Sequence, residues 1–147
     1  MKLSAKSRYA IAALIEMGQI SGAEKPITII SLSEKLGISK IYLEQVFSLL
    51  KRGEIVVSIK GAQGGYQLSR PMQEISAYDI LSSTESSLFE QPDQTVADSA
   101  PNIESVLQND ILKELDTAIS EALKKIKLDA LVAKAGEYGN AEYMYYL

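Results

Sequence analysis

The pattern that most constrains this 147-residue chain is a pair of short predicted helices followed directly by a glycine-tipped hairpin. Residues 30–36 predict a short helix, Gly37 and Ile38 a tight turn, and residues 39–52 a second helix. The stretch Lys60–Pro71 (KGAQGGYQLSRP) follows as a basic β-hairpin. We therefore predict a mainly α fold with a small β-hairpin, arranged as a winged helix-turn-helix and extended by a long C-terminal helix.

Charge is distributed unevenly along the chain. Residues 1–73 carry ten Lys or Arg and five Glu, a net charge of +5, whereas the remaining residues carry −9 and bring the total to −4. Nucleic-acid binding depends on the local potential at the docking face, so an acidic total does not exclude it. The basic first half favours DNA as the partner, and a merely solvated surface is the alternative.

The residue types that the chain lacks narrow its chemistry. It has no Cys and no His, so we expect no disulfide, no thiolate or imidazole catalysis, no metal, no cofactor and no enzyme. No apolar run approaches the ~20 residues that cross a bilayer, and the first eight residues lack the apolar core of a signal peptide. We expect a cytoplasmic protein without membrane association.

Local patterns predict where helices begin and which faces they bury. The first helix is expected to begin at Ser4 or Ser7, and Ser39 is the expected N-cap of the helix over 40–52. Ser31 with Glu34 three residues later predicts a capping box for the helix between them. Spacings of three and four predict these buried positions: Ala10, Ile11, Leu14, Ile15, Gly18, Leu43, Val46, Phe47 and Leu50.

The hairpin has its own periodicity. Ile55, Val57 and Ile59 alternate with more polar residues and predict a strand with one buried face, and residues 66–69 predict the return strand. Glycine tolerates positive φ and has no side chain that would hold the backbone away from a phosphate, which suits close approach to DNA. An ordinary glycine-rich hairpin is the alternative. The tip and its basic flanks are Lys60, Gly61, Gly64, Gly65 and Arg70.

The second half predicts a linker and a long helix. Ser76 with Asp79 predicts a capped helix over 75–81, and residues 82–101 are poor in apolar side chains. A helix over 103–128 would span about 39 Å and leave an apolar stripe in water, which predicts dimerisation, with folding back onto its own domain as the alternative. We expect a DNA-binding domain over 1–81, a linker over 82–101, and a dimerisation helix with a tail over 102–147. The stripe consists of Ile103, Leu107, Ile111, Leu115, Ala118, Ile119, Ala122 and Ile126.

Four strings of this sequence together resemble the Rrf2 family of bacterial transcription regulators. They are residues 3–10 (LSAKSRYA), residues 38–47 (ISKIYLEQVF), the wing from Lys60 to Arg70, and the pairs at 75–76 and 79–80. The resemblance implies a homodimeric winged helix-turn-helix repressor or regulator that binds a palindromic double-stranded operator. It places DNA contacts at the start of the second helix and on the wing, and Lys6 and Arg8 near the N-terminus are expected backbone contacts. The predicted contact residues are Lys6, Arg8, Ser39, Lys40, Tyr42, Glu44, Gln45, Lys60, Gly61, Gly64, Gly65 and Arg70.

Each of these contacts has a chemical expectation. Glu44 is expected to accept from a cytosine amino group and Gln45 to pair with an adenine edge. Lys6, Arg8 and Lys60 are expected to bind phosphates without regard to sequence. For Tyr42 the alternative is that its ring packs against the wing.

Many family members hold an iron–sulfur cluster through cysteines in the loop that corresponds to residues 86–101. This chain has no cysteine, and the carboxylates Glu90, Asp93 and Asp98 cannot replace thiolates, so we expect no cluster. The chain is similar to the cluster-free branch that regulates cysteine metabolism, which implies cysteine synthase as a partner. A winged helix that binds only proteins is the other class of function that remains.

The C-terminal tail is rich in tyrosine. Four of the eight tyrosines fall in the last ten residues, and exposed aromatic side chains anchor protein partners well. The tail therefore predicts a partner surface, with packing back onto the winged domain as the alternative. The residues of this predicted surface are Tyr143, Tyr145, Tyr146 and Leu147.

Overall fold

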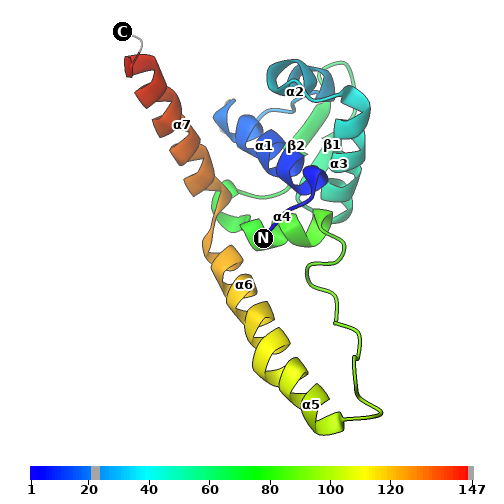
Figure 1. The fold of residues 1–147 in the computed structure, drawn as a ribbon. Helices are drawn as coiled ribbons and strands as arrows, with labels where there is room; N and C mark the ends of the chain where they lie inside the picture. Colours follow the sequence, from blue (N-terminus) through cyan, green and yellow to red (C-terminus); the bar gives the residue numbers. More distant parts are fainter. Residues whose placement is uncertain (21–23, 146–147) are drawn as a thin grey trace.

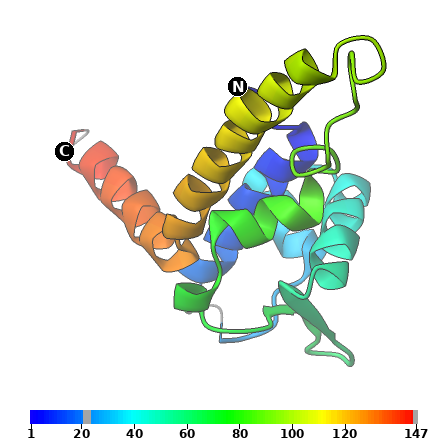
Figure 2. The same cartoon turned by 90° about the horizontal axis from the view of Figure 1, so that it is seen from below.

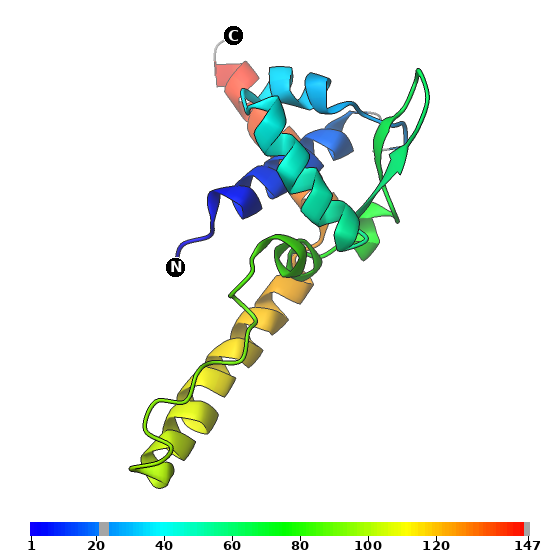
Figure 3. The same ribbon diagram turned by 90° about the vertical axis from the view of Figure 1, so that its right-hand side faces the viewer.

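The computed structural model describes residues 1–20 and 24–145 and has a helical body from which a helical rod projects (Figures 1 and 3). The body contains α1 to α4 and the hairpin, while α5 and α6 form the rod and α7 returns beside α1. The mainly α fold with one antiparallel hairpin confirms the predicted fold class. The elements are α1 (Ala5–Gln19), α2 (Ile29–Leu36), α3 (Lys40–Arg52), β1 (Val56–Ile59), β2 (Gly65–Leu68), a 3₁₀ turn (Met72–Glu74), α4 (Ala77–Thr84), α5 (Pro101–Val106), a π-helical segment (Leu107–Leu112), α6 (Lys113–Lys125) and α7 (Leu128–Tyr145).

Side-chain caps begin the helices largely where the sequence predicts them. Ser4 accepts a hydrogen bond from the Ser7 backbone N–H at the start of α1, and Ser39 caps α3 in the same way. Ser76 and Asp79 form a reciprocal capping box at the start of α4. These caps satisfy backbone N–H groups that the first helical turn leaves without a partner, so a local signal suffices to place them.

The predicted capping box of α2 is wrong. Thr28 is the N-cap, and its hydroxyl accepts from the backbone N–H of Ser31, which already belongs to the first helical turn. Threonine is also a favourable N-cap residue, and Ile27 pairs with Tyr66 of the hairpin immediately before it. This strand-like pairing holds Ile27 extended, so the helix begins earlier than Ser31.

The core lies where α1, α3 and α4 meet. Its largest side chains are fully buried, and each contributes roughly 1.5–3 kcal/mol through removal from water. The predicted inward face of α3 is confirmed at all four positions, while Ile11 and Ile15 of α1 are only partly buried. The core includes Leu14, Met17, Leu32, Leu43, Val46, Phe47, Leu50, Ile55, Ile75, Ile80 and Leu128.

The hairpin pairs as predicted, but its predicted buried face is wrong. Val56 pairs with Leu68 at its base and Ile59 with Gly65 near its tip. Ile55 and Val56 are buried, whereas Val57 and Ile59 are 42% and 40% exposed. The hairpin projects from the body, so only its base reaches the core, and alternation along the strand no longer decides burial (Figure 3).

The long helix ends earlier than predicted because distant backbone pairs with it. The rod runs from Pro101 to Lys125, but Ile126 is extended. Its carbonyl accepts from the Ala77 N–H at 2.8 Å, and the Leu128 N–H donates to the Ile75 carbonyl at 2.8 Å. This short strand-like pairing stops the helix and starts α7. Ile126 therefore lies past the end of the helix that carries the other residues of the predicted stripe.

Much of the predicted tail is the helix α7, whose first half packs against α1. Leu128 is fully buried, and Val132 packs so closely on Gly18 that a Cβ there would lie 2.4 Å from a Val132 methyl carbon. Tyr143 and Tyr145 belong to the last turn of α7, whereas Tyr146 and Leu147 lie outside the described residues. The described part of the chain has no helix long and apolar enough to cross a membrane.

Candidate nucleic-acid interface

The first two turns of α3 carry an exposed polar surface. Lys40, Glu44 and Gln45 are exposed, while the opposite side of α3 is buried in the core. Lys6 of α1 joins the same surface, because it lines a shallow hollow of about 410 Å³ together with residues of α3. The structure therefore brings three of the predicted contact residues together. The hollow is lined by Lys6, Ile41, Glu44, Gln45, Ser48 and Leu49.

The charges on this surface are only loosely paired. Lys40 and Glu44 form an ion pair one helical turn apart, with a nitrogen–oxygen distance of 3.8 Å, and both side chains are more than half exposed. Pairs of this kind contribute at most about 0.5 kcal/mol, so either group can turn to a new partner at little cost.

Tyr42 does not pack against the wing, so the alternative position predicted for its ring is wrong. Its ring meets Tyr9 of α1 edge to face, with ring centroids 5.0 Å apart. The wing places its own aromatic residue, Tyr66, against Phe47, with centroids 4.8 Å apart. Tyr42 is half-buried at the junction of α1 and α3 and helps to hold the start of α3 on α1.

A hydrogen-bonded carboxylate fixes the start of α1. Glu85, just after α4, accepts from the backbone N–H and the hydroxyl of Ser4, at 3.2 and 3.1 Å, and from the hydroxyl of Ser7. The bond from Ser7, helped by those from Ser4, lowers the pKa of Glu85 below its ordinary value despite partial burial. These bonds join α1 to α4 and leave Lys6 and Arg8 exposed.

Backbone geometry explains the glycines of the wing. Gly61 has φ of +109°, which L-residues with side chains rarely adopt. A Cβ on Gly65 would lie 2.5 Å from the Ile27 carbonyl oxygen, because the two segments pair at that point. Gly64 is equally crowded by Ile59. Lys60 is exposed beside this tip. The hairpin's own construction therefore demands glycine, and phosphate approach is a separate prediction.

Arg70 lies apart from the other predicted contacts. Its guanidinium donates to the Glu54 and Glu74 carbonyls, both at 3.1 Å, and pairs with Asp79 at 3.2 Å. Burial raises the pKa of Asp79, but the Ser76 hydrogen bonds and Arg70 outweigh this and hold that pKa below its ordinary value. Arg70 lines a separate hollow together with Arg52, which lies at the opposite end of α3 from Ser39. The Arg70 guanidinium therefore joins the base of the wing to α4.

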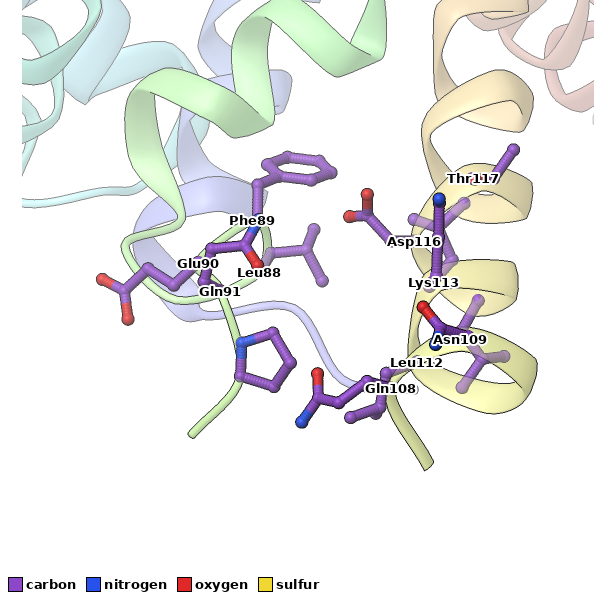
Figure 4. Close-up of a pocket in the computed structure, with 13 residues that line it drawn as sticks. Leu88, Phe89, Glu90, Gln91, Gln108, Asn109, Leu112, Lys113, Asp116 and Thr117 are labelled. Atoms are coloured by element: carbon purple, nitrogen blue, oxygen red, sulfur yellow. The ribbon is translucent and has the colours of Figure 1, made fainter. Parts of the chain in front are cut away.

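A third hollow, of about 580 Å³, separates the loop after α4 from the rod (Figure 4). Phe89 anchors this loop through its ring contact with Tyr78, at 4.8 Å between centroids, and the Lys124 ammonium lies 4.6 Å from the Tyr78 centroid. Figure 4 shows Glu90 and Gln91 on the loop opposite Gln108, Lys113 and Asp116 of the rod. Its lining is Leu88, Phe89, Glu90, Gln91, Pro92, Gln108, Asn109, Leu112, Lys113, Leu115, Asp116, Thr117 and Ile119.

The short turn at Gly37, the exposed start of α3 and the projecting hairpin define a winged helix-turn-helix, a class of DNA-binding fold. A family model described as Rrf2, iron-dependent transcriptional regulator, matches residues 3–134. The chain belongs to the Rrf2 family of DNA-binding transcriptional regulators. Its relatives are regulators of transcription and not enzymes.

Individual relatives agree with this assignment. The transcriptional regulator IscR of Pectobacterium atrosepticum is 33% identical over 132 residues, covering 90% of this chain and 79% of its own. The structure of CymR, the global cysteine regulator of B. subtilis, superposes with a TM-score of 0.71 at 30% identity, covering 91% of this chain and 98% of its own. The structure of T. potens IscR gives a TM-score of 0.70 at 30% identity, covering 94% and 90%.

The residues of this chain do not fit an iron–sulfur cluster, although the family description names iron. Such clusters are held by cysteine thiolates, with histidine replacing two of them in one class, and the chain contains neither residue type. The hollow beside the loop offers amides, carboxylates and one ammonium group instead. Within residues 1–20 and 24–145, no three His, Cys, Asp or Glu side chains gather as they would around a metal ion.

Sequence reasoning missed Ile41 in the exposed hollow. Ile41, the second residue of α3, carries no predicted role, and its side chain is 71% exposed. A signal was available, because Glu44 and Gln45 follow Ile41 at spacings of three and four and therefore share its helical face.

The network around Glu85 predicts a pH dependence of folding stability. The ordinary carboxyl pKa of 4.5 is lowered in the folded protein, so the charged group contributes stability that is fully present above pH 4.5 and is lost as the pH falls through the folded pKa. Glu85→Gln is expected to lower the free energy of unfolding at neutral pH and to flatten its decline in acid. Urea unfolding over a pH series measures both effects.

The matched control for Glu85→Gln is Glu34→Gln, which alters an exposed carboxylate on α2 and should change neither quantity. An acid decline equally steep in wild type and Glu85→Gln would contradict the role of this network.

Proposed function

We propose that this regulator binds its operator sequence-specifically as a homodimer. In this complex α3 enters the major groove, and the wing contacts the phosphates beside it. The observation that carries the proposal is the exposed polar start of α3 beside Lys6 of α1. The N-terminal part of a recognition helix is the part that reaches base edges. The proposal assigns the DNA-binding function to residues 1–81, with 82–101 as linker and 102–147 as the dimerisation and tail region.

Specificity and affinity fall to different side chains in this proposal. Glu44 accepts from a cytosine amino group and Gln45 pairs with an adenine edge. A carboxylate near phosphates is otherwise repelled, so Glu44 favours specificity over affinity. Ser39, Lys40 and Tyr42 contact DNA around the start of α3. Lys6, Arg8, Lys60, Gly61, Gly64 and Gly65 meet the phosphate backbone. Arg70 supports the wing from its base.

The apolar stripe on the rod supports dimerisation. Ile103, Ile111 and Leu115 are 54%, 48% and 53% exposed. Leu115 and Ile119 border the hollow beside the protein's own loop, yet Leu115 stays more than half exposed there. A second copy would cover the stripe and remove these side chains from water. The residues proposed to lie in this interface are Ile103, Leu107, Ile111, Leu115, Ile119, Ala122 and Ile126.

For the signal, we propose regulation without a cluster, in which the protein acts as a repressor in cysteine metabolism and responds to cysteine synthase as a partner. Support comes from the structural similarity to a global cysteine regulator and from a sequence without Cys or His. The end of α7 is the proposed docking segment, because Glu137 and Tyr138, which precede it on the same helix, are exposed. The proposed segment comprises Tyr143, Tyr145, Tyr146 and Leu147.

The phosphate contacts predict a sequence-independent loss of affinity. Lys6→Ala and Lys60→Ala should each weaken binding to promoter duplex and to scrambled duplex by similar factors. Each lost contact should reduce the slope of log affinity against log salt by about one, and hence by about two in a dimer. Fluorescence anisotropy across a salt series measures both quantities. Lys134→Ala on α7 is the control and should change neither.

Gln45→Ala tests base recognition in the same assay. It should weaken promoter binding by about 5- to 160-fold per half-site and leave scrambled binding unchanged, because a bidentate base contact contributes about 1–3 kcal/mol of discrimination. Equal losses on both duplexes would contradict the role of Gln45. Equal affinity of the wild type for both duplexes would favour the alternative function, a winged helix that binds only proteins.

A single charged substitution within the stripe should dissociate the proposed dimer. Leu115→Asp should convert the protein to its 16.1 kDa monomer in sedimentation equilibrium, because the interface would have to bury the aspartate. Thr117→Asp is the matched control, since Thr117 is exposed, lies about 160° around α6 from Leu115 and is not part of the stripe, so it should leave the dimer intact. A Leu115→Asp protein that remains dimeric would contradict the proposed interface.

Partner sensing predicts a response of the promoter complex to cysteine synthase. Adding the enzyme should change promoter affinity, and deleting residues 143–147 should abolish this change while the dimer persists. Unchanged affinity would move the search to another effector. Loss of the dimer in the deletion variant would show that the tail closes the dimer instead.

A further inference from the structure

Ile41 stands out among the apolar side chains of α3. The helix buries Leu43, Val46, Phe47 and Leu50 completely, yet Ile41 at its second position is 71% exposed. It lines the hollow of Lys6, Glu44 and Gln45 described above. An apolar side chain of this size gains free energy when a partner covers it. Because Ile41 lies on the surface proposed to enter the major groove, DNA is the partner that can cover it there.

The major groove offers a suitable apolar group. Base edges there display hydrogen-bond donors and acceptors, and the exception is the C5-methyl group of thymine. Isoleucine can form no hydrogen bond through its side chain, so among base edges it favours that methyl. Its β-branched side chain has one strongly preferred χ1 rotamer in a helix, which limits the entropy lost on contact.

Position along the helix supports the same partner. Ile41 precedes Glu44 by three residues and Gln45 by four, so the three side chains share one face of α3. Lys6 on α1 lines the same hollow, and its ammonium group can bind a phosphate near the bases that this face would reach. A base step read by Glu44 and Gln45 therefore brings a neighbouring base edge to Ile41.

We propose that Ile41 is a specificity-determining residue that contacts the C5-methyl group of a thymine in each half-site of the operator. This inference rests on the proposed function, because it requires α3 to enter the major groove. It adds a requirement that Glu44 and Gln45 cannot impose, namely a thymine recognised by its methyl group instead of by hydrogen bonds.

The test removes only the methyl groups. Duplexes selected by the wild-type protein from a random library are remade with deoxyuridine in place of each symmetry-related pair of thymines in turn. One pair should weaken wild-type binding by about fourfold per half-site, the effect of about 0.8 kcal/mol for one buried methyl-sized group. Ile41→Ser should bind less tightly to the thymine duplex and be indifferent to that exchange, while Ile41→Val should keep the dependence.

Ile30→Ser is the matched control, because Ile30 is 54% exposed at the second position of α2 and does not line the hollow. It should retain the wild-type response to deoxyuridine. Thermal unfolding of each variant confirms that it is folded.

Two outcomes overturn the inference while leaving the proposed function intact: selected duplexes that tolerate deoxyuridine everywhere, or Ile41→Ser retaining the wild-type dependence. If the wild type selects no sequence, the proposed function itself fails, and the inference fails with it.

Discussion

Burial of one face of α3 against α1 is the interaction on which the rest of the structure depends. The helical repeat that sends Val46, Phe47 and Leu50 into the core necessarily turns Glu44 and Gln45 outward. Folding and the display of a recognition surface are therefore two results of one amphipathic pattern. The Ser39 cap fixes where this helix begins, and the Tyr9–Tyr42 ring contact holds its first turns on α1.

The pairing of residues 75–77 with 126–128 joins the rod to this body. It stops α6, sets the direction of α7 and places Leu128 in the core (Figure 2). In the proposed dimer the same pairing would set the position of each recognition helix relative to the stripe. Two further contacts hold the segment after α4. Glu85 is bonded to Ser4 at the start of α1, and the Phe89 ring packs on Tyr78 of α4. Movement of the rod relative to α3 would therefore have to alter these few contacts.

Local physics made much of the fold predictable. The caps at Ser4, Ser39 and Ser76 and the inward face of α3 depend on residues a few positions apart, and each was confirmed. The helix end at Lys125 depends on backbone about 50 residues away, which periodicity cannot detect. The burial of Val57 and Ile59 was misjudged for a related reason, because a strand's pattern does not reveal that its tip leaves the body.

The candidate interface was predictable to a similar degree. Glu44, Gln45 and Lys6 were predicted separately and lie around one hollow. Arg70 looked equivalent to Lys60 in sequence, but its guanidinium is held by the Glu54 carbonyl, 16 residues before it, and by the Glu74 carbonyl and the Asp79 carboxylate after it. Ile41 was overlooked because an apolar residue in a helix normally indicates core, although its spacing to Glu44 and Gln45 places it on the polar face.

The central claim is that two copies of this α3 surface and wing engage duplex DNA symmetrically. Hydroxyl-radical footprinting of the protein on its own promoter tests this most directly. We expect two protected regions related by two-fold symmetry, with centres about 10 base pairs or a multiple of that apart. Protection should vanish with Leu115→Asp at concentrations where wild type binds. A single region without symmetry, or a wild-type footprint unchanged in the Leu115→Asp variant, would contradict it.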